Sequence, residues 1–324
     1  MTRIGRVARA LLGVAILLLV LGLLLRFAGL LPLEKSEAEA GAAAAYVPVA
    51  PPPRHAAGNP VAIRGPTPPP DETLPDWRRY AAVAPPDTGQ PRVVIVIDDL
   101  GLDRVAVRRL AAIPGPLTLS FLPYAPALAE QTAVARAAGH ELLVHLPMEP
   151  KGVASDPGPM VLASALSAAE FDRRLEWNLD RFPGFVGVNN HMGSRLTENR
   201  AAMRRVMQVL RQRGLLFLDS RTTPRTVAEA EAAAAGVPHA ARQIFLDNEQ
   251  DARAVRTQLA KLERMARRRG LAIAIGHPHR ETIDALGEWI PAVRRAGIAI
   301  APLSAAVIAP ATAPLTATAA AGRR

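Results

Sequence analysis

Short apolar runs, most of which end in or just before a polar residue, constrain the fold of this chain more than any other feature. Seven such runs are rich in Val, Ile, Leu and Phe: Val93 to Ile97, Leu117 to Leu122, Leu142 to His145, Phe185 to Asn190, Leu215 to Asp219, Ile244 to Asp247 and Leu271 to His277. Runs of this length without alternation are typical of strands that are buried in a parallel sheet. An eighth run, Ile298 to Leu303, completes the predicted set.

The segments between these runs have the spacing of amphipathic helices, with apolar residues three or four apart among arginines and glutamates. The predicted helices are 102–113, 126–138, 168–182, 199–213, 226–235, 251–269 and 281–296. Several of them end just before a glycine, which is a usual stop signal. Alternation of strands and helices over about two hundred residues predicts an α/β fold, either a (β/α) barrel or a doubly wound sheet.

Only part of the chain has the composition of a folded domain, which we place at residues 91–306. Residues 34–90 are dominated by Ala and Pro and contain few large apolar side chains. This composition predicts a disordered linker that is partly extended and partly flexible. Residues 307–324 are mainly Ala, Thr and Pro and end in two arginines, so we expect a disordered tail.

The amino terminus has the pattern of an export or anchoring signal within residues 1–33. Three arginines in the first nine residues precede an apolar stretch, Ala10 to Leu33, which only Arg26 interrupts. About 20 apolar residues span a bilayer, and the positive-inside rule then places the domain outside the cytoplasm. We expect an inner-membrane anchor with the domain in the periplasm. The alternative is a cleaved, secreted form, because Ala38 to Ala40 resembles a signal-peptide cleavage site.

Charge and cysteine content narrow the classes of function. The chain carries 39 Lys and Arg against 29 Asp and Glu, a formal net charge of +10, and it has no cysteine. The core therefore forms without disulfides. The arginines are scattered and no aromatic residues are interleaved with them, which argues against nucleic-acid binding. Attraction to an anionic membrane face or an acidic glycan fits this charge better.

Polar residues gather where the predicted strands end. In both candidate architectures the carboxyl ends of the strands meet around one opening. The residues at or just past these ends are Asp98, Asp99, His145, Asn189, Asn190, His191, Asp219, Asp247 and His277. We therefore expect the functional site at this edge of the sheet.

Asp98 and Asp99 are adjacent carboxylates at the end of the first run. We expect them to project to different sides, so that one binds a metal and the other faces the substrate. The alternative is that one of them caps the helix that starts near Leu102, a role that Asp performs well.

His145 and Glu149 are four residues apart, but Pro147 between them argues against a helix that would bring them together. A histidine at a buried strand end is often a hydrogen-bonded core residue. The carboxylates at the neighbouring strand end favour the metal-ligand interpretation instead.

The segment Asn189 to Ser194 places Asn189, Asn190 and His191 in a turn that either orients a substrate or completes a metal shell. The alternative is that the asparagine side chains bond to the backbone of the turn. Asp219 either orients an imidazole or forms an ion pair with Arg221.

Asp99 and His145, with a third ligand from His191 or Glu149, would bind a divalent metal, and these ligand types favour zinc. Asp98 would then serve as the base. His277, with His279 two residues later, would serve as a general acid, because imidazole exchanges protons near neutrality.

An ordered set of motifs resembles the divergent polysaccharide deacetylases, a branch of the NodB-like carbohydrate esterases. The motifs are Ile97-Asp-Asp-Leu-Gly101, Gly139-His-Glu141 leading to His145-Leu-Pro-Met-Glu-Pro150, Val188-Asn-Asn-His-Met-Gly-Ser194, Phe217-Leu-Asp-Ser220, Phe245-Leu-Asp-Asn248 and Gly276-His-Pro-His279. The resemblance implies a distorted (β/α) barrel of seven or eight strands. It also implies a carbohydrate substrate, Asp98 as base and Asp99 as metal ligand.

This chain departs from the wider NodB-like pattern at two points. Glu149 stands where that family has the second of two metal histidines, and the arginine-proline motif of the family is missing. The expected function is an exported, metal-dependent deacetylase that acts on an acetylated cell-envelope glycan. The alternatives are a non-catalytic glycan-binding or envelope-organising protein, and a metal-free glycosidase that uses Asp98 and Glu149 as paired carboxylates.

Overall fold

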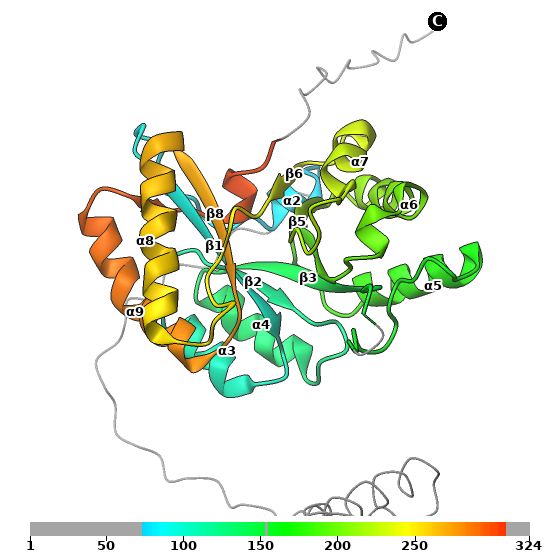
Figure 1. Ribbon diagram of the computed structural model, residues 1–324, viewed down its shortest axis with the longest axis horizontal. Helices are drawn as coiled ribbons and strands as arrows, with labels where there is room; N and C mark the ends of the chain where they lie inside the picture. The colour runs from blue at the N-terminus through cyan, green and yellow to red at the C-terminus, as the bar shows by residue number, and fades with distance from the viewer. Residues whose placement is uncertain (1–72, 153–154, 309–324) are drawn as a thin grey trace, which may run out of the picture. The chain divides into compact units, whose positions relative to one another are not determined.

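The computed structural model describes residues 73–152 and 155–308 (Figure 1). The predicted membrane anchor, the linker up to residue 72 and the tail from residue 309 lie outside these ranges. Among the described residues, no helix has the length and the apolar character that a membrane span needs.

The described chain alternates strands and helices. The strands are β1 (Arg92–Leu100), β2 (Thr118–Phe121), β3 (Glu141–Met148), β4 (Gly187–Met192), β5 (Leu216–Asp219), β6 (His239–Ala241), β7 (Ile244–Phe245), β8 (Leu271–Gly276) and β9 (Ala299–Ile300). The helices are α2 (Asp76–Arg79), α3 (Arg104–Ala111), α4 (Leu128–Ala137), α5 (Ala168–Leu179), α6 (Arg200–Gln212), α7 (Ala228–Ala235), α8 (Ala252–Arg269) and α9 (Arg280–Arg295), with 3-10 turns η2 (Leu196–Glu198) and η3 (Leu303–Ala305).

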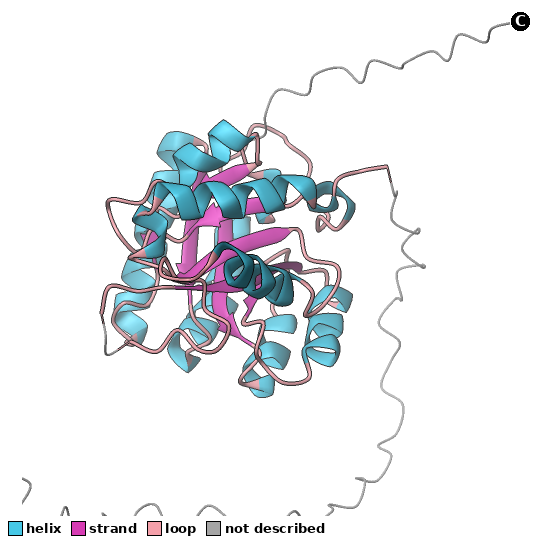
Figure 2. Cartoon of the chain, turned by 90° about the vertical axis from the view of Figure 1, so that its right-hand side faces the viewer, coloured by secondary structure: helices cyan, strands magenta, loops and turns pink. Residues whose placement is uncertain are grey.

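All the strand pairs are parallel, and the sheet runs in the order β6-β5-β4-β3-β2-β1-β8-β7, with β9 paired to β1. The two ends of this path, β6 and β7, are consecutive in the chain. Arg242 N donates to Asp219 O of β5, and Gln243 N donates to Ile273 O of β8. One bent segment therefore joins both ends of the sheet, and helices surround the strands (Figures 1 and 2). The fold is the predicted distorted (β/α) barrel.

Alternate residues of the strands fill two separate cores, because successive strand side chains point to opposite faces. Val93, Ile95 and Ile97 of β1 belong to the core shared with the helices. Val94 and Val96 belong to a second core among the strands, together with residues such as Leu143, Val186, Leu218 and Ile275. Burial on both faces explains why the runs in the sequence are continuous rather than alternating.

Two sequence-based boundaries need correction. The composition places residues 73–90 in the linker, but Trp77 and Tyr80 pack against the core among the strands, and Trp77 N donates to Gly214 O at 2.9 Å. Two aromatic side chains bury enough apolar surface to hold this segment on the domain. At the other end, Ile308 of the predicted tail forms an antiparallel bridge with His239. Strand β6 does not appear among the predicted strands, since its three residues are too few for a periodic signal.

A fully buried carboxylate, Glu141, ties several of these elements together at the start of β3. It accepts hydrogen bonds from Thr118 Oγ1, from the backbone N–H and hydroxyl of Ser304, and from Ala82 N. Burial raises the pKa of Glu141, and these donors oppose that rise. Glu141 lies at the end of β3 that is remote from His145. Its role in the Gly139-His-Glu141 motif is therefore structural.

We predict that Glu141→Ala destabilises the protein by about 3 kcal/mol, because the substitution leaves several buried donors without an acceptor. Denaturant unfolding of the full chain measures this loss. Glu130→Ala, which removes an exposed carboxylate 3.4 Å from Arg104, is the matched control and should change the unfolding free energy by less than about 1 kcal/mol. Equal losses in the two variants would contradict the structural role of Glu141.

Candidate functional site

The end of β1 is distorted in a way that brings two adjacent carboxylates to one place. The register between β1 and β2 shifts between Ile97 and Leu100, and Asp99 has a φ of 56° in the left-handed region. Asp98 Oδ2 lies 3.6 Å from His145 Nε2, and Asp99 Oδ1 lies 3.2 Å from the same nitrogen. A regular strand would send the two side chains to opposite faces. The expectation that they diverge was therefore wrong. The cap of α3 is Asp103, not either of these residues.

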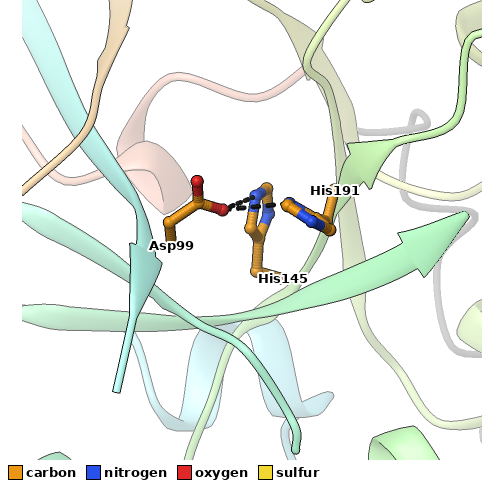
Figure 3. Close-up of side chains that lie close together, drawn as sticks. All are labelled: Asp99, His145 and His191. Atoms are coloured by element: carbon orange, nitrogen blue, oxygen red, sulfur yellow. Dashed lines mark ion pairs between the residues drawn. The ribbon is translucent and has the colours of Figure 1, made fainter. Parts of the chain in front are cut away.

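Three side chains from neighbouring strands form a compact cluster (Figure 3). Asp99 of β1, His145 of β3 and His191 of β4 each offer one ligand atom, and these atoms lie within 4.8 Å of one another. Asp99 Oδ1 is 2.9 Å from His191 Nδ1. The rings of His145 and His191 meet edge to face, with their centroids 4.8 Å apart. The side chains converge because β3 and β4 pair in register, with His145 opposite Asn189 and Pro147 opposite His191.

Asn189 is the hydrogen-bonding centre of the site. Its Oδ1 accepts from Ser120 Oγ at 2.5 Å and faces His145 Nδ1 at 2.9 Å. Its Nδ2 donates to Asp98 Oδ1 at 2.8 Å and to Ser220 Oγ at 3.1 Å. Because Asn189 Oδ1 is an acceptor, His145 Nδ1 carries a proton, and this bond orients the ring so that His145 Nε2 faces Asp99.

The geometry around Asp99 fits a metal ligand. Asp99 Oδ1 is buried and accepts no well-directed hydrogen bond among the described residues, although two imidazole nitrogens lie within 3.2 Å of it. A carboxylate oxygen and two imidazole nitrogens that lie within 4.8 Å of one another match the ligand types that zinc takes from Asp and His. Burial raises the pKa of Asp99, but His145 and His191 lower it more, so the carboxylate stays ionised. These residues therefore fit a divalent cation, with zinc favoured by ligand type.

Asp98 is 2% exposed, and its surroundings differ from those of Asp99. Burial raises the pKa of Asp98, while His145, His277 and the amide of Asn189 oppose this rise. A carboxylate with a raised pKa is a better proton acceptor at neutral pH than an exposed one.

His277, just past the end of β8, is oriented by Asp247. Its Nδ1 lies 2.9 Å from Asp247 Oδ1, and Asp247 Oδ2 accepts from His277 N and from Thr282 Oγ1. His277 Nε2 points toward Asp99, with 4.0 Å between Nε2 and Oδ2. Burial lowers the pKa of His277, but the hydrogen bond and charge of Asp247, with Asp98 and Asp99, raise it to about 9.

The other residues singled out in the sequence lie around this site in supporting positions. Glu149 Oε2 accepts from Ser164 N and Oγ, and its Oε1 is 3.4 Å from Arg195, so the structure does not place Glu149 in the cluster. Asn190 faces the other side of β4 and accepts from Ser220 N. Of Asn189 and Asn190, it is Asn190 whose side chain bonds to the backbone of a turn, as the alternative interpretation expected.

Asp219 neither orients an imidazole nor forms an ion pair with Arg221. It accepts from Arg221 N and from Thr226 Oγ1 and so fixes the loop after β5, while burial raises its pKa. The guanidinium of Arg221 faces Glu229 at 3.3 Å. His279 lies beside His277, with ring centroids 5.9 Å apart, and shares with it and Asp247 a second group of possible metal ligands.

Three residues near the site carried no signal that sequence reasoning used. Ser120 bonds to Asn189, Phe245 stacks at 5.7 Å on His277, and Tyr124 follows β2 in the loop toward α4. Burial raises the pKa of Tyr124, as do the charges of Asp99 and Asp156. Only Tyr124 follows an apolar run, so the strand-end rule could have included it, whereas Ser120 and Phe245 lie within their runs.

The fold and the site together define a (β/α) barrel with a candidate His/carboxylate metal centre. The family model described as "Divergent polysaccharide deacetylase" matches residues 95–307, and the chain belongs to this family. Polysaccharide deacetylases act on acetylated carbohydrates.

The proteins that are similar to the chain include two relatives from other bacteria and one crystal structure. "Uncharacterized protein YibQ" of Escherichia coli (strain K12) is 37% identical over 200 residues, which cover 61% of this chain and 62% of that protein. An uncharacterized protein of Haemophilus influenzae is 35% identical over 198 residues, covering 61% of this chain and 70% of that one. The crystal structure of uncharacterized protein ATU2773 from Agrobacterium tumefaciens C58 has a TM-score of 0.70 and 31% identity, and the match covers 72% of this chain and 96% of that one.

We predict that the full chain binds zinc and that Asp99→Ala, His145→Ala and His191→Ala each abolish stoichiometric binding. Elemental analysis after dialysis measures the metal content, and thermal unfolding confirms that each variant folds. Glu149→Ala is the matched control and should retain zinc, because its carboxylate is held by Ser164 and Arg195. Zinc retained by His191→Ala and lost by Glu149→Ala would reverse the assignment of the third ligand.

We also predict that His277 titrates near pH 9 in the metal-free protein and that Asp247→Asn moves its pKa downward. Since the folded pKa lies above the ordinary value of 6.5, the stabilisation from this pair is complete at pH below 6.5 and is lost as pH rises through about 9. NMR titration of the imidazole measures the pKa. Asp251→Asn, at the cap of α8, is the control; an unshifted His277 in Asp247→Asn would contradict the pairing.

Proposed function

We propose that this chain is an exported, membrane-tethered, metal-dependent deacetylase that removes acetyl groups from a cell-envelope glycan. The observation that carries the proposal is the cluster of Asp99, His145 and His191, with Asp98 and His277 directed at it. Membership of the divergent polysaccharide deacetylases supports the substrate class. Export and tethering rest on the sequence of residues 1–33.

The metal would be held by Asp99, His145 and His191. When bound, a divalent cation at such a site activates water and polarises a carbonyl oxygen. Asn189 fixes the His145 ring with Nε2 toward the cluster, and Asn189 also holds Asp98 next to it. The side chains of His145 and Asp98 therefore have little freedom to move, and such restriction positions reacting groups.

Asp98 and His277 divide the proton transfers of the proposed reaction. Asp98 accepts the proton of the water that attacks the acetyl carbonyl. His277, which Asp247 keeps protonated at neutral pH, donates a proton to the leaving nitrogen or oxygen of the sugar. The products are acetate and a free amino or hydroxyl group, and the two side chains return to their starting states by exchange with solvent.

We expect Asp98→Asn to lower acetate release from acetylated glycans by about 10²-fold to 10⁴-fold, because the amide does not accept the proton. Zinc content and unfolding temperature should stay close to those of the wild-type chain. Asp103→Asn is the matched control: it lies five residues later and retains the ability to cap α3. Unchanged acetate release by Asp98→Asn would refute the role of Asp98 as base.

A second candidate function is a glycan-binding protein without catalysis. The observation that favours it is Glu149, which stands at the position of the second metal histidine of the wider family and is bonded to Ser164 instead. This alternative expects glycan binding that a chelator does not alter and no release of acetate. The glycosidase alternative loses support from the same contacts, because neither oxygen of Glu149 is free to act with Asp98.

A further inference from the structure

A pocket of about 510 Å³ lies on the outside of the barrel between β7 and α8. Its volume falls within the range of roughly 300 to 1,000 Å³ that is usual for small-molecule sites. Its lining contains four cationic side chains, Arg242, Lys261, Arg264 and Arg268, with Gln and Asn side chains, and no carboxylate. The pocket is therefore suited by charge to an anion.

The pocket exists because the barrel omits one helix. Strand and helix alternate from β1 to β6, but only Arg242 and Gln243 separate β6 from β7. No helix can form in two residues, so the wall formed by β7 is covered from one side by α8 alone. The cations of α8 are spaced three and four apart, at 261, 264 and 268, and therefore form one stripe along the helix.

This stripe is not neutralised within the protein. Among residues 73–152 and 155–308, Lys261, Arg264 and Arg268 form no ion pair and no side-chain hydrogen bond. Arg267 on another side of the same helix does have a partner, since its Nη2 lies 2.8 Å from Glu263 Oε1. Three neighbouring like charges without a partner repel one another, and a bound anion would relieve that repulsion.

Arg242 and Phe245 connect the pocket with the candidate active site. Arg242 donates to Ser220 O at 2.7 Å and to Arg221 O at 2.9 Å, which fixes the guanidinium beside the loop after β5. That guanidinium lies 3.9 Å from the centroid of the Phe245 ring. Phe245 in turn stacks on His277, with an interplanar angle of 16°. One wall of the pocket is thus in contact with the proposed general acid.

We infer that this pocket is a subsite for an acidic group of the glycan, so that the substrate carries carboxylates or phosphates near the acetylated sugar. The inference rests on the proposed function and specifies its substrate class. A membrane surface fits the pocket less well, because membrane insertion uses exposed apolar side chains and none of the exposed large ones lines it.

The test measures binding rather than turnover. The full chain is titrated by calorimetry with hexagalacturonate, which bears carboxylates, with inorganic pyrophosphate, and with the neutral hexamer of N-acetylglucosamine. The same titrations use the variant Lys261→Gln/Arg264→Gln/Arg268→Gln. The matched control is Arg253→Gln/Arg269→Gln/Arg295→Gln, which removes three exposed cations from α8 and α9 outside the pocket and causes the same change in net charge.

We expect an acidic probe to bind the wild-type and control chains and to lose affinity by about tenfold or more in the pocket variant. The stronger of the two acidic probes identifies the charged group. Equal losses in both variants would show attraction to net charge alone and overturn the inference. If neither acidic probe binds, the inference is also overturned. It is overturned as well if anionic phospholipid vesicles bind in a pocket-dependent way and hexagalacturonate does not.

Failure of this inference can be told apart from failure of the proposed activity. Asp98→Asn should bind the acidic probe as the wild-type chain does, because Asp98 does not line the pocket. Acetate release combined with no pocket-dependent binding would remove the subsite and leave the deacetylase. Pocket-dependent binding with no acetate release from any acetylated glycan would remove the deacetylase and leave an acidic-glycan subsite.

Discussion

The site depends above all on the buried side-chain amide of Asn189. Four hydrogen-bonding contacts link this amide to Asp98 of β1, Ser120 of β2, His145 of β3 and Ser220 beyond β5. An unpaired amide at this depth would cost free energy, whereas a fully bonded one fixes the relative positions of the strands that it touches. The same bonds select the tautomer of His145 and orient Asp98. One residue, Asn189, therefore both fixes neighbouring strands and orients side chains that the proposed reaction uses.

Much of the fold could be predicted because its signals are periodic. The helix spacing located α3 to α9 within a few residues, and the buried runs located every strand except β6, which is three residues long. The residues of the metal cluster could also be nominated, since parallel strand ends meet at one edge. The conformation of Asp99 could not, because a left-handed φ at a non-glycine residue leaves no mark in the sequence. Nor could the segment around Trp77, where two aromatic residues outweigh a proline-rich composition.

The neighbours Asn189 and Asn190 show why a motif alone does not assign roles. Both are amides at the end of one strand, and successive side chains of a strand point to opposite faces. Asn189 therefore reaches the cluster, while Asn190 supports the backbone at Ser220. His191 is two residues after Asn189 in β4, so its side chain points to the same face as that of Asn189. His145 and His277 also differ in their hydrogen-bond partners. The amide of Asn189 orients His145, and the carboxylate of Asp247 orients His277.

The closure of the barrel by a single bent segment has a mechanical consequence. In a barrel closed by two strands, the ring opens when the hydrogen bonds between them break. Here the chain itself crosses from β6 to β7 through Arg242 and Gln243, while hydrogen bonds hold β6 to β5 and β7 to β8. The separation of β5 from β8 at this point therefore depends on the length of the crossing, because no hydrogen-bond ladder pairs β6 with β7. A residue inserted there would let β5 and β8 move apart, and it would also displace Arg242, which borders the pocket.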